Sequence, residues 1–347
     1  MKNRHLLPLG IICLAFLPLW ALLRLPRSQP VLAALPAAGL SCSGGATPLT
    51  LWTDNLENGA GNWQPGGLTS TWGLSSFRRH DGLFAYRATD LAVPSDQWAQ
   101  PPAMVLPPAG MGPIQFHFWN WQALEDGPHG CFDGGFLEYS LDGGAQWQVF
   151  TATQLLTDPY DGPISPDYNN PAAGHDAWCG DPQDWLESVV DLSALAGETV
   201  NFRFRLATDE NNGREGWYLD TLSLDACLPA SGYGARLTPA LSRHTVAPGE
   251  VITHTFVLEN LGQSETFNVG LSGASWPTAV TSGGSLLVPA GLTGTITVQV
   301  TPPLVAASDA FTLTVSSSHD PAHVTMVAVG HTNGAHFSHL PIIIVPK

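Results

Sequence analysis

The chain reads Asp133-Gly-Gly-Phe-Leu-Glu-Tyr-Ser-Leu-Asp-Gly-Gly-Ala-Gln-Trp147 at the place that decides its fold. Between two Asp-Gly-Gly turns lies a short strand whose side chains alternate with period two. Glycine supplies the positive φ that such turns need, and aspartate hydrogen-bonds the turn backbone. The stretch contains no evident nucleophile or general base. It indicates a rigid β-protein with acidic loops, a scaffold suited to binding and often to calcium.

Length and composition fit an exported two-domain β-protein. The 347 residues leave room for two domains. The net charge is -16, yet charged residues make up only 12% of the chain, so the excess is not a disordered acidic tail. The 36 Gly, 29 Pro and 12 Trp indicate many turns and short strands. Such an acidic surface repels phosphate backbones, which argues against nucleic acid as a partner, and attracts hard cations.

Residues 1–38 are expected to be a signal peptide. Lys2 and Arg4 precede an apolar run over 6–23, and an alanine-rich stretch with small-residue cleavage sites follows. An uncleaved anchor is the alternative, because eighteen residues just span a bilayer. Prolines inside the run weaken that alternative. We therefore expect a secreted or cell-surface protein that meets a membrane only through this leader, if the leader is retained.

Cysteine usage agrees with export. Cys13 lies in the apolar run, and four cysteines remain. An even count in an exported protein favours disulfides, with three connectivities open. Cys42 and Cys227 flank one candidate domain, so pairing them would join its ends and leave Cys131 for Cys179. A lipid-modified Cys42 is the alternative, but it would leave an odd thiol.

The tryptophan distribution divides the chain. Residues 43–228 hold ten of the twelve tryptophans and residues 235–330 hold one. Turn residues at 229–234 form the linker. Residues 331–347 form a tail, expected to dock as an extended strand; a sorting or attachment signal is the alternative.

Both segments are predicted to be all-β. In the first, side chains alternate over 114–121, 200–206 and 217–224, and helical periodicity is limited to one turn at 191–197. In the second, about seven short strands favour an immunoglobulin-like sandwich. His254 falls on an apolar strand face, which is typical of a hydrogen-bonded core or edge histidine. The expected fold is a jelly-roll (concanavalin-like) β-sandwich followed by an immunoglobulin-like β-sandwich.

Several motifs occur in a familiar order over residues 50–226. The chain resembles the MAM-like jelly-roll module that accompanies immune-inhibitor-A-type secreted metallopeptidases, through Asp54-Asn-Leu-Glu57, Phe116-His-Phe-Trp119, Asp133-Gly-Gly, Asp142-Gly-Gly-Ala-Gln-Trp147 and Gly216-Trp-Tyr-Leu-Asp220. Residues 236–330 resemble bacterial CARDB-type or other immunoglobulin-like modules, through Asn260-Leu-Gly262 and Val288-Pro-Ala-Gly291. The resemblance implies an accessory domain that often carries calcium. The peptidase signature His-Glu-x-x-His is absent, so the resemblance does not imply protease activity.

The resemblance also implies calcium ligands. Calcium takes six to eight oxygens, and the best candidates are Glu57, Asp81, Asp209 and Asp220, with Asp54 at the start of the same first strand as Glu57. The alternative is that these acids cap turns or face solvent.

Aromatic density suggests carbohydrate stacking. Trp72, Trp98, Trp121, Trp178 and Trp185 occupy loop-like or strand-end places, and we expect Trp121, Trp178 and Trp185 to bind ligand. The alternative is that they fill the core. The long loop over 159–185, tethered by Cys179, is the expected place for a ligand site.

No enzyme activity is expected. Glu138 and Asp142 would lie roughly 13 Å apart along one strand, which is too far for a glycosidase pair. The tail histidines His331, His336 and His339 could hold a transition metal, but exposed tail residues are the better interpretation.

The sequence thus predicts a non-catalytic, two-domain β-protein stabilised by calcium and disulfides. Its expected work is recognition or adhesion, with an extracellular protein or a glycan as partner. The alternative is a carbohydrate-binding accessory component of a secreted hydrolase or peptidase system.

Overall fold

In the computed structural model of the chain, residues 39–334 are described, and the predicted leader, His336 and His339 lie outside them. Residues 39–334 consist of strands, loops and three single 3-10 turns, one of which is Ser193–Leu195, inside the predicted turn at 191–197. No helix within these residues is long and apolar enough to cross a membrane. The all-β prediction is confirmed.

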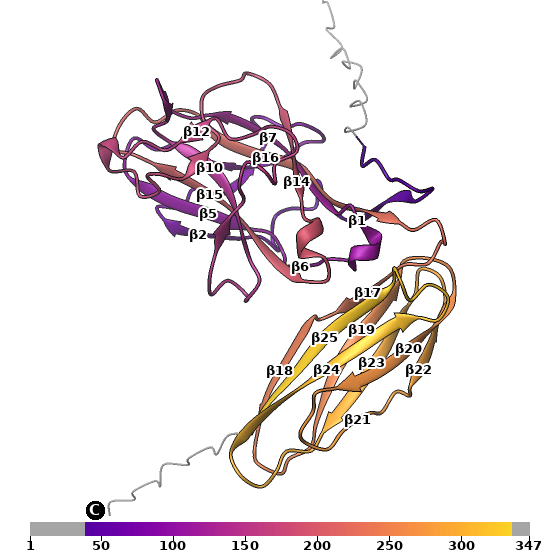
Figure 1. Ribbon diagram of the computed structural model, residues 1–347. Coiled ribbons are helices and arrows are strands. Elements are labelled where there is room, and N and C mark those ends of the chain that lie inside the picture. Colours follow the sequence, from indigo (N-terminus) through magenta and orange to yellow (C-terminus); the bar gives the residue numbers. More distant parts are fainter. Residues whose placement is uncertain (1–38, 335–347) are drawn as a thin grey trace, which may run out of the picture. The chain divides into compact units, whose positions relative to one another are not determined.

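The first sandwich consists of two antiparallel sheets (Figure 1). One sheet has the order β14-β7-β16-β4-β3, with β1 also paired to β16: β14 (Leu186–Asp191), β7 (Gln115–Ala123), β16 (Gly216–Leu228), β4 (Ala85–Ala88), β3 (Gly73–Ser75) and β1 (Thr47–Asp54). The other has the order β11-β10-β15-β5-β2, with β6 also paired to β15: β11 (Gln148–Val149), β10 (Gly134–Ser140), β15 (Thr199–Thr208), β5 (Ser95–Gln100), β2 (Gln64–Leu68) and β6 (Met104–Val105).

The chain passes back and forth between these two sheets. Strands β4, β7, β14 and β16 lie in one sheet, while β5, β10 and β15, which alternate with them along the sequence, lie in the other. The inward side chains of the long strands meet between the sheets as an aromatic core, in which Phe116 stacks on Phe202 with 4.7 Å between ring centroids. The predicted alternation at 114–121, 200–206 and 217–224 is the sequence signature of β7, β15 and β16.

Both disulfides lie in the first sandwich. Cys42 is bonded to Cys227 and Cys131 to Cys179, which is one of the three connectivities that the cysteine count allows and the one favoured above. The first joins the segment before β1 to the end of β16, and the second ties hairpin β8 (Asp126–Gly127)–β9 (Gly130–Cys131) to the chain after β13 (Asp176–Ala177). The loop predicted at 159–185 is partly ordered, because β13 pairs with β12 (Gly162–Pro163).

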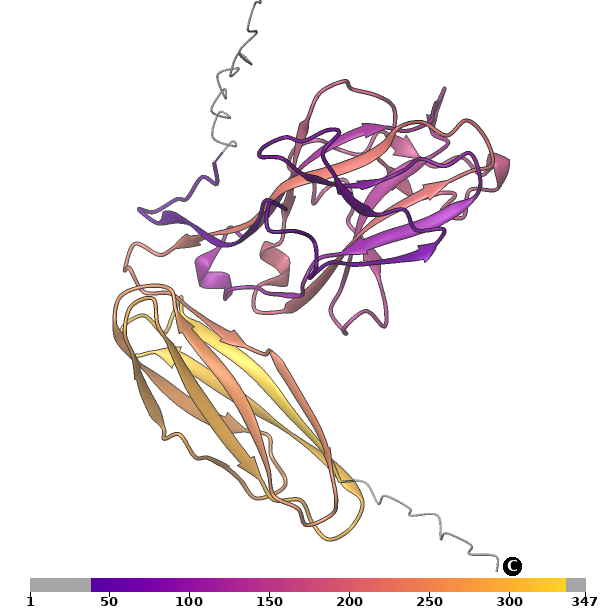
Figure 2. The ribbon, with the colours of Figure 1, turned by 180° about the vertical axis from the view of Figure 1, so that it is seen from behind.

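The second sandwich follows from Ala235 onward and also has two layers (Figure 2). One sheet has the order β17-β19-β23-β21: β17 (Ala235–Thr238), β19 (Ile252–Asn260), β23 (Thr293–Val300) and β21 (Thr278–Val280). The other has the order β18-β25-β24-β20-β22: β18 (Leu241–Val246), β25 (Thr325–Gly334), β24 (Ala307–Ser317), β20 (Glu265–Ser272) and β22 (Ser285–Val288). These are nine strands rather than about seven.

Residues 331–334 of the predicted tail form an extended strand of the second sandwich, as expected, and residues 335–347 lie outside the described part of the chain. Strand β25 continues to Gly334, and His331 lies opposite Ala310 of β24 and Arg243 of β18. The ladder extends because β25 is flanked by strands on both sides, so His331 is half-buried in the sheet rather than part of an exposed tail.

His254 is fully buried and joins the two sheets of the second sandwich. Its Nδ1 lies 2.9 Å from the Ser242 hydroxyl and its Nε2 lies 2.8 Å from the Thr332 hydroxyl. Burial lowers the pKa of His254 to about 4, and His244 and His331 act in the same direction. The expectation of a hydrogen-bonded core histidine is confirmed.

We expect the second sandwich to lose stability as the pH falls below 6.5. The unfolded chain binds a proton at His254 near pH 6.5, whereas the folded chain binds it only near pH 4. The loss of folding free energy therefore begins near pH 6.5 and levels off below about pH 4. Its full size is roughly 3 kcal/mol. Hydrogen exchange of the β19 amides between pH 7 and pH 4 measures it. A His254→Gln variant should lose this part of the pH dependence, and an unchanged slope in that variant would contradict the assignment.

Candidate metal centre and ligand-binding face

Strand register brings four acidic loops to one end of the first sandwich. Strands β4 and β7 both end beside the first residues of β16, and β10 begins beside the end of β15. The loop after β4, the loop after β7, the loop before β10 and the loop after β15 each place one acid there: Asp90, Glu125, Asp133 and Asp209. We call these four residues the acidic cluster.

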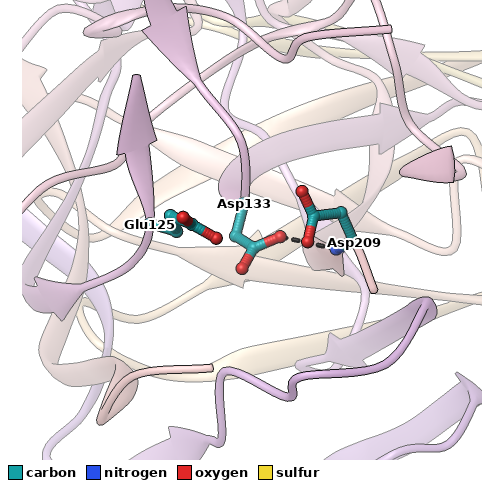
Figure 3. A group of neighbouring side chains, drawn as sticks. All are labelled: Glu125, Asp133 and Asp209. Carbon is teal, nitrogen blue, oxygen red and sulfur yellow. Dashed lines mark hydrogen bonds between the residues drawn. The ribbon is translucent and has the colours of Figure 1, made fainter. Parts of the chain in front are cut away.

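Three of the four carboxyl groups of the acidic cluster converge. One oxygen each from Glu125, Asp133 and Asp209 lies within 4.8 Å of the other two, and Figure 3 shows the three groups directed toward one another. The Asp209 amide donates to Asp133 Oδ1, and the Asn211 amide donates to Asp209 Oδ1 at 2.7 Å. These hydrogen bonds use one oxygen of each aspartate and leave the second free.

Five carboxylate oxygens of the acidic cluster are buried without a hydrogen-bond donor. They are both oxygens of Asp90, Oε2 of Glu125, Oδ2 of Asp133 and Oδ2 of Asp209. Asp133 and Asp209 are fully buried and Asp90 is 3% exposed. An unpaired buried carboxylate costs several kcal/mol, so this concentration of unpaired oxygens requires protons or a cation.

The electrostatics agree. Burial is the main cause that raises the pKa of Asp133, and the adjacent carboxyl of Asp90 raises it further. Burial also raises the pKa of Asp90 and of Asp209. Among residues 39–334 no lysine, arginine or histidine forms an ion pair with any of the four. The acidic cluster is therefore a buried group that could bind a metal ion.

The ligands implied by the resemblance do not form one group. Asp209 lies in the acidic cluster, whereas Glu57 and Asp220 hold the turn after β3 by accepting backbone hydrogen bonds. Glu57 Oε1 accepts from Leu83 and Phe84, both at 2.8 Å, and Asp220 Oδ2 accepts from His80 at 2.7 Å. A metal role for Glu57 and Asp220 stays a prediction.

The other two implied ligands also act locally. Asp81 is exposed and accepts from the Gly82 amide, its next neighbour, at 2.8 Å. Asp54 caps a turn, with Oδ1 accepting from the Leu56 amide and Oδ2 from the Trp63 indole at 2.9 Å. Their role as ligands likewise stays a prediction.

A second feature is the outer face of the β10–β15–β5 sheet. Glu138 of β10 lies opposite Arg203 of β15, and Arg205 lies opposite Trp98 of β5. Directly opposite residues point to the same side of a sheet. We call this the Trp98–Arg203 face; it comprises Asp96, Trp98, Glu138, Trp147, Arg203 and Arg205.

Ion pairs and aromatic rings interlock on the Trp98–Arg203 face. Arg205 donates two hydrogen bonds to Asp96, at 2.6 and 2.8 Å, and one to Glu138 at 3.1 Å. Arg203 also pairs with Glu138, and its guanidinium lies 4.3 Å from the Trp147 ring centroid and 6.0 Å from that of Trp98. Both indoles are half-buried and lie beside these fixed donors and acceptors.

The tryptophans predicted to bind ligand lie outside the Trp98–Arg203 face. Trp178 is fully buried, so its prediction was wrong: the chain at 178 bridges to Gly135 of β10, which draws the indole into the core. Trp121 is 4% exposed because the Arg78 guanidinium covers its ring at 3.7 Å. Trp185 is half-buried on the other sheet, where it packs beside Trp121, and its ring centroid lies 5.9 Å from that of His80. Trp72 is 7% exposed.

Sequence reasoning missed most of both features. It named Asp209 and Trp98 but not Asp90, Glu125 or Asp133 as ligands. The signal for Asp133 was present in its Asp-Gly-Gly turn, where an acid directly precedes a buried strand. For Trp147 and Arg203 the signal was an aromatic residue after a turn and an arginine between inward phenylalanines. Their juxtaposition depends on strand pairing, which no local pattern fixes.

No known protein family matches the sequence. A stretch of 124 residues is 27% identical to Bacillopeptidase F of Bacillus subtilis (strain 168); it covers 35% of this chain and 7% of that protein. The chain thus spans a small fraction of the curated relative it matches.

Structural likenesses are distant. The N-terminal CBM22-1-CBM22-2 tandem domain from Paenibacillus barcinonensis has a TM-score of 0.31 at 11% identity, covering 76% of this chain and 87% of that one. A glycoside hydrolase domain of Endo-D from Streptococcus pneumoniae R6 has a TM-score of 0.28 at 11% identity, covering 78% and 37%. With TM-scores below 0.5, neither likeness carries an argument about function.

Proposed function

We propose that this chain is a non-catalytic, exported glycan-binding protein that recognises a neutral polysaccharide through the Trp98–Arg203 face, as an accessory component of a secreted hydrolase or peptidase system. The observation that carries the proposal is the pairing of two half-buried indoles with a fixed ladder of guanidinium and carboxylate groups on the outside of a sheet. The two disulfides favour an extracellular location.

The chemistry of this face suits a sugar. An indole ring offers a flat apolar surface for the C–H face of a pyranose. The neighbouring guanidinium and carboxylate groups offer donors and acceptors for hydroxyls, and their bidentate pairing with one another holds them in place. Two arginines balance two carboxylates, and the chain as a whole is acidic. This balance favours a neutral glycan over a polyanion.

An accessory role is proposed over adhesion. The similarity to a small part of a much longer peptidase is consistent with a module that accompanies a hydrolase. Calcium is part of the proposal as a structural ion, and sugar recognition on the Trp98–Arg203 face does not pass through it. Adhesion to a protein would need a contact surface, and the described residues favour the aromatic face over the acidic loops.

Trp98→Ala and Trp147→Ala are each expected to weaken binding to a neutral polysaccharide at least tenfold, since loss of one aromatic contact removes about 1.4 kcal/mol or more. Binding of the purified protein to a panel of neutral and acidic polysaccharides, followed by calorimetry on the best one, measures this. Trp185→Ala is the matched control, because it removes a half-buried indole from the other sheet and should leave affinity unchanged. Equal affinity in all three variants, or retention of acidic polysaccharides alone, would refute the proposal.

A further inference from the structure

The loops of the acidic cluster also hold the base of the β8–β9 hairpin. The backbone carbonyl of Glu125 accepts from the amides of Phe132 at 2.9 Å and Asp133 at 3.0 Å, which closes the chain over 126–131. Cys131 at the end of this hairpin is bonded to Cys179. Residues of the hairpin and residues 163–167 line a cavity of about 350 Å³. Whatever binds the acidic cluster therefore acts on the hairpin and its cavity.

One oxygen each from Glu125, Asp133 and Asp209 lies within 4.8 Å of the other two, and Asp90 lies beside Asp133. Asp133 and Asp209 are fully buried, and each turns one unpaired oxygen into the group. Asp90 is 3% exposed, and neither of its carboxylate oxygens has a hydrogen-bond partner. A shared proton satisfies one pair of carboxylates, and the third carboxylate of the converging group Glu125, Asp133 and Asp209 would remain without one.

The ligand chemistry selects a hard cation. All side-chain donors are carboxylate oxygens, with no histidine or thiolate among them, which disfavours zinc, copper and iron. Two oxygens bound to one calcium ion at about 2.4 Å are at most about 4.8 Å apart, and the oxygens of Glu125, Asp133 and Asp209 lie within 4.8 Å of one another. Magnesium requires a tighter octahedron and keeps most of its water, which suits a set of carboxylates with two fully buried members less well.

We propose that Glu125, Asp133 and Asp209 bind one calcium ion, with Asp90 beside them, and that this ion clamps the β8–β9 hairpin to the loop after β15. This is the site of the structural calcium ion that belongs to the proposed function. It differs from the ligand set implied by the resemblance, of which it keeps only Asp209. It stands independently of glycan binding, because the ion touches none of the residues of the Trp98–Arg203 face.

Calorimetric titration of the chelator-treated full chain with CaCl₂ is the first test. Asp133→Asn and Asp209→Asn should each lose one equivalent of bound calcium relative to the unmodified chain. Glu57→Gln and Asp220→Asn are the matched controls from the other acidic group, and they should keep that equivalent. Retention in Asp133→Asn and Asp209→Asn would overturn the proposal, as would titration of the unmodified chain without binding.

Thermal melting provides a second readout. Calcium at a hundredfold excess over its Kd should raise the melting temperature of the first sandwich by about 5–10 °C. Asp133→Asn keeps an acceptor for the Asp209 amide but removes one negative charge. In chelator this variant should melt above the unmodified chain, and in calcium below it. The reverse order in either condition would contradict a cation site.

Hydrogen exchange tests the clamp itself. The amides of Phe132 and Asp133 should exchange at least tenfold more slowly in calcium than in chelator, because the ion fixes the Glu125 loop that accepts from them. Amides of β19 in the second sandwich serve as the internal control and should not change. Equal exchange of Phe132 and Asp133 in both conditions would remove the clamp. None of these readouts uses a sugar, so failure of glycan binding would leave them interpretable.

Discussion

Trp178→Ala is expected to destabilise the first sandwich by about 3–5 kcal/mol, the usual cost of deleting a fully buried tryptophan. The ring packs among Phe118, Tyr160 and Trp217, with centroid distances of 5.7, 4.5 and 5.8 Å. Its Nε1 donates to the Asp158 carbonyl at 2.9 Å. The substitution thus leaves a large cavity and an unpaired carbonyl, and urea unfolding followed by circular dichroism measures the loss.

Trp185→Ala provides the comparison for this prediction. Its indole is only half-buried, so we expect a loss of about 1 kcal/mol or less. Similar losses in the two variants would show that Trp178 is not part of the core. A loss of sugar binding in Trp178→Ala without a loss of stability would restore it as a ligand-binding residue.

Replacing both Cys42 and Cys227 by serine is expected to destabilise the first sandwich by about 5 kcal/mol in the chain-entropy account. The bridge spans 185 residues, which is nearly the whole domain. The bridge joins the segment before β1 to the end of β16. These two strands pair along their length, from Thr47 opposite Leu228 to Asp54 opposite Leu222. Without the bridge, the unfolded chain gains the freedom that the closed loop denied it.

The second disulfide closes a shorter loop and allows the stabilising effects of the two bridges to be compared. Cys131 and Cys179 are 48 residues apart, so the same account predicts a loss of about 4 kcal/mol when both become serine. Urea midpoints of the two double variants, measured without reductant, rank the bridges. A larger loss of stability for the Cys131–Cys179 variant would mean that the entropy of loop closure is not the main contribution. The bridge would then stabilise the hairpin at 126–131 through local contacts.

Local patterns carried most of the information about the fold. Alternation at 114–121, 200–206 and 217–224 predicted β7, β15 and β16. Such alternation can be recognised in a strand's own sequence, without knowing which strand pairs with it. The end of β25 lay outside the reach of such patterns, because the strand continues to Gly334 between β18 and β24. A strand end set by its neighbours has no local signature.

The acidic cluster shows the same limit more sharply. Asp90, Glu125, Asp133 and Asp209 are spread over 120 residues of sequence, and each follows or precedes a strand in an ordinary acidic loop. Resemblance therefore grouped Asp209 with Glu57 and Asp220, whose carboxylates accept hydrogen bonds from a single turn instead.

By itself the sequence determined an all-β, disulfide-bonded protein with acidic loops, because side-chain periodicity, turn residues and cysteine count act over short distances or through simple arithmetic. Only the tertiary structure decided which carboxylates lie together unpaired, which tryptophans are covered and which flank Arg203. Those relations depend on the pairing of distant strands, and a shift of one residue in register would turn strand residues such as Trp98 and Arg203 to the other side of their sheet.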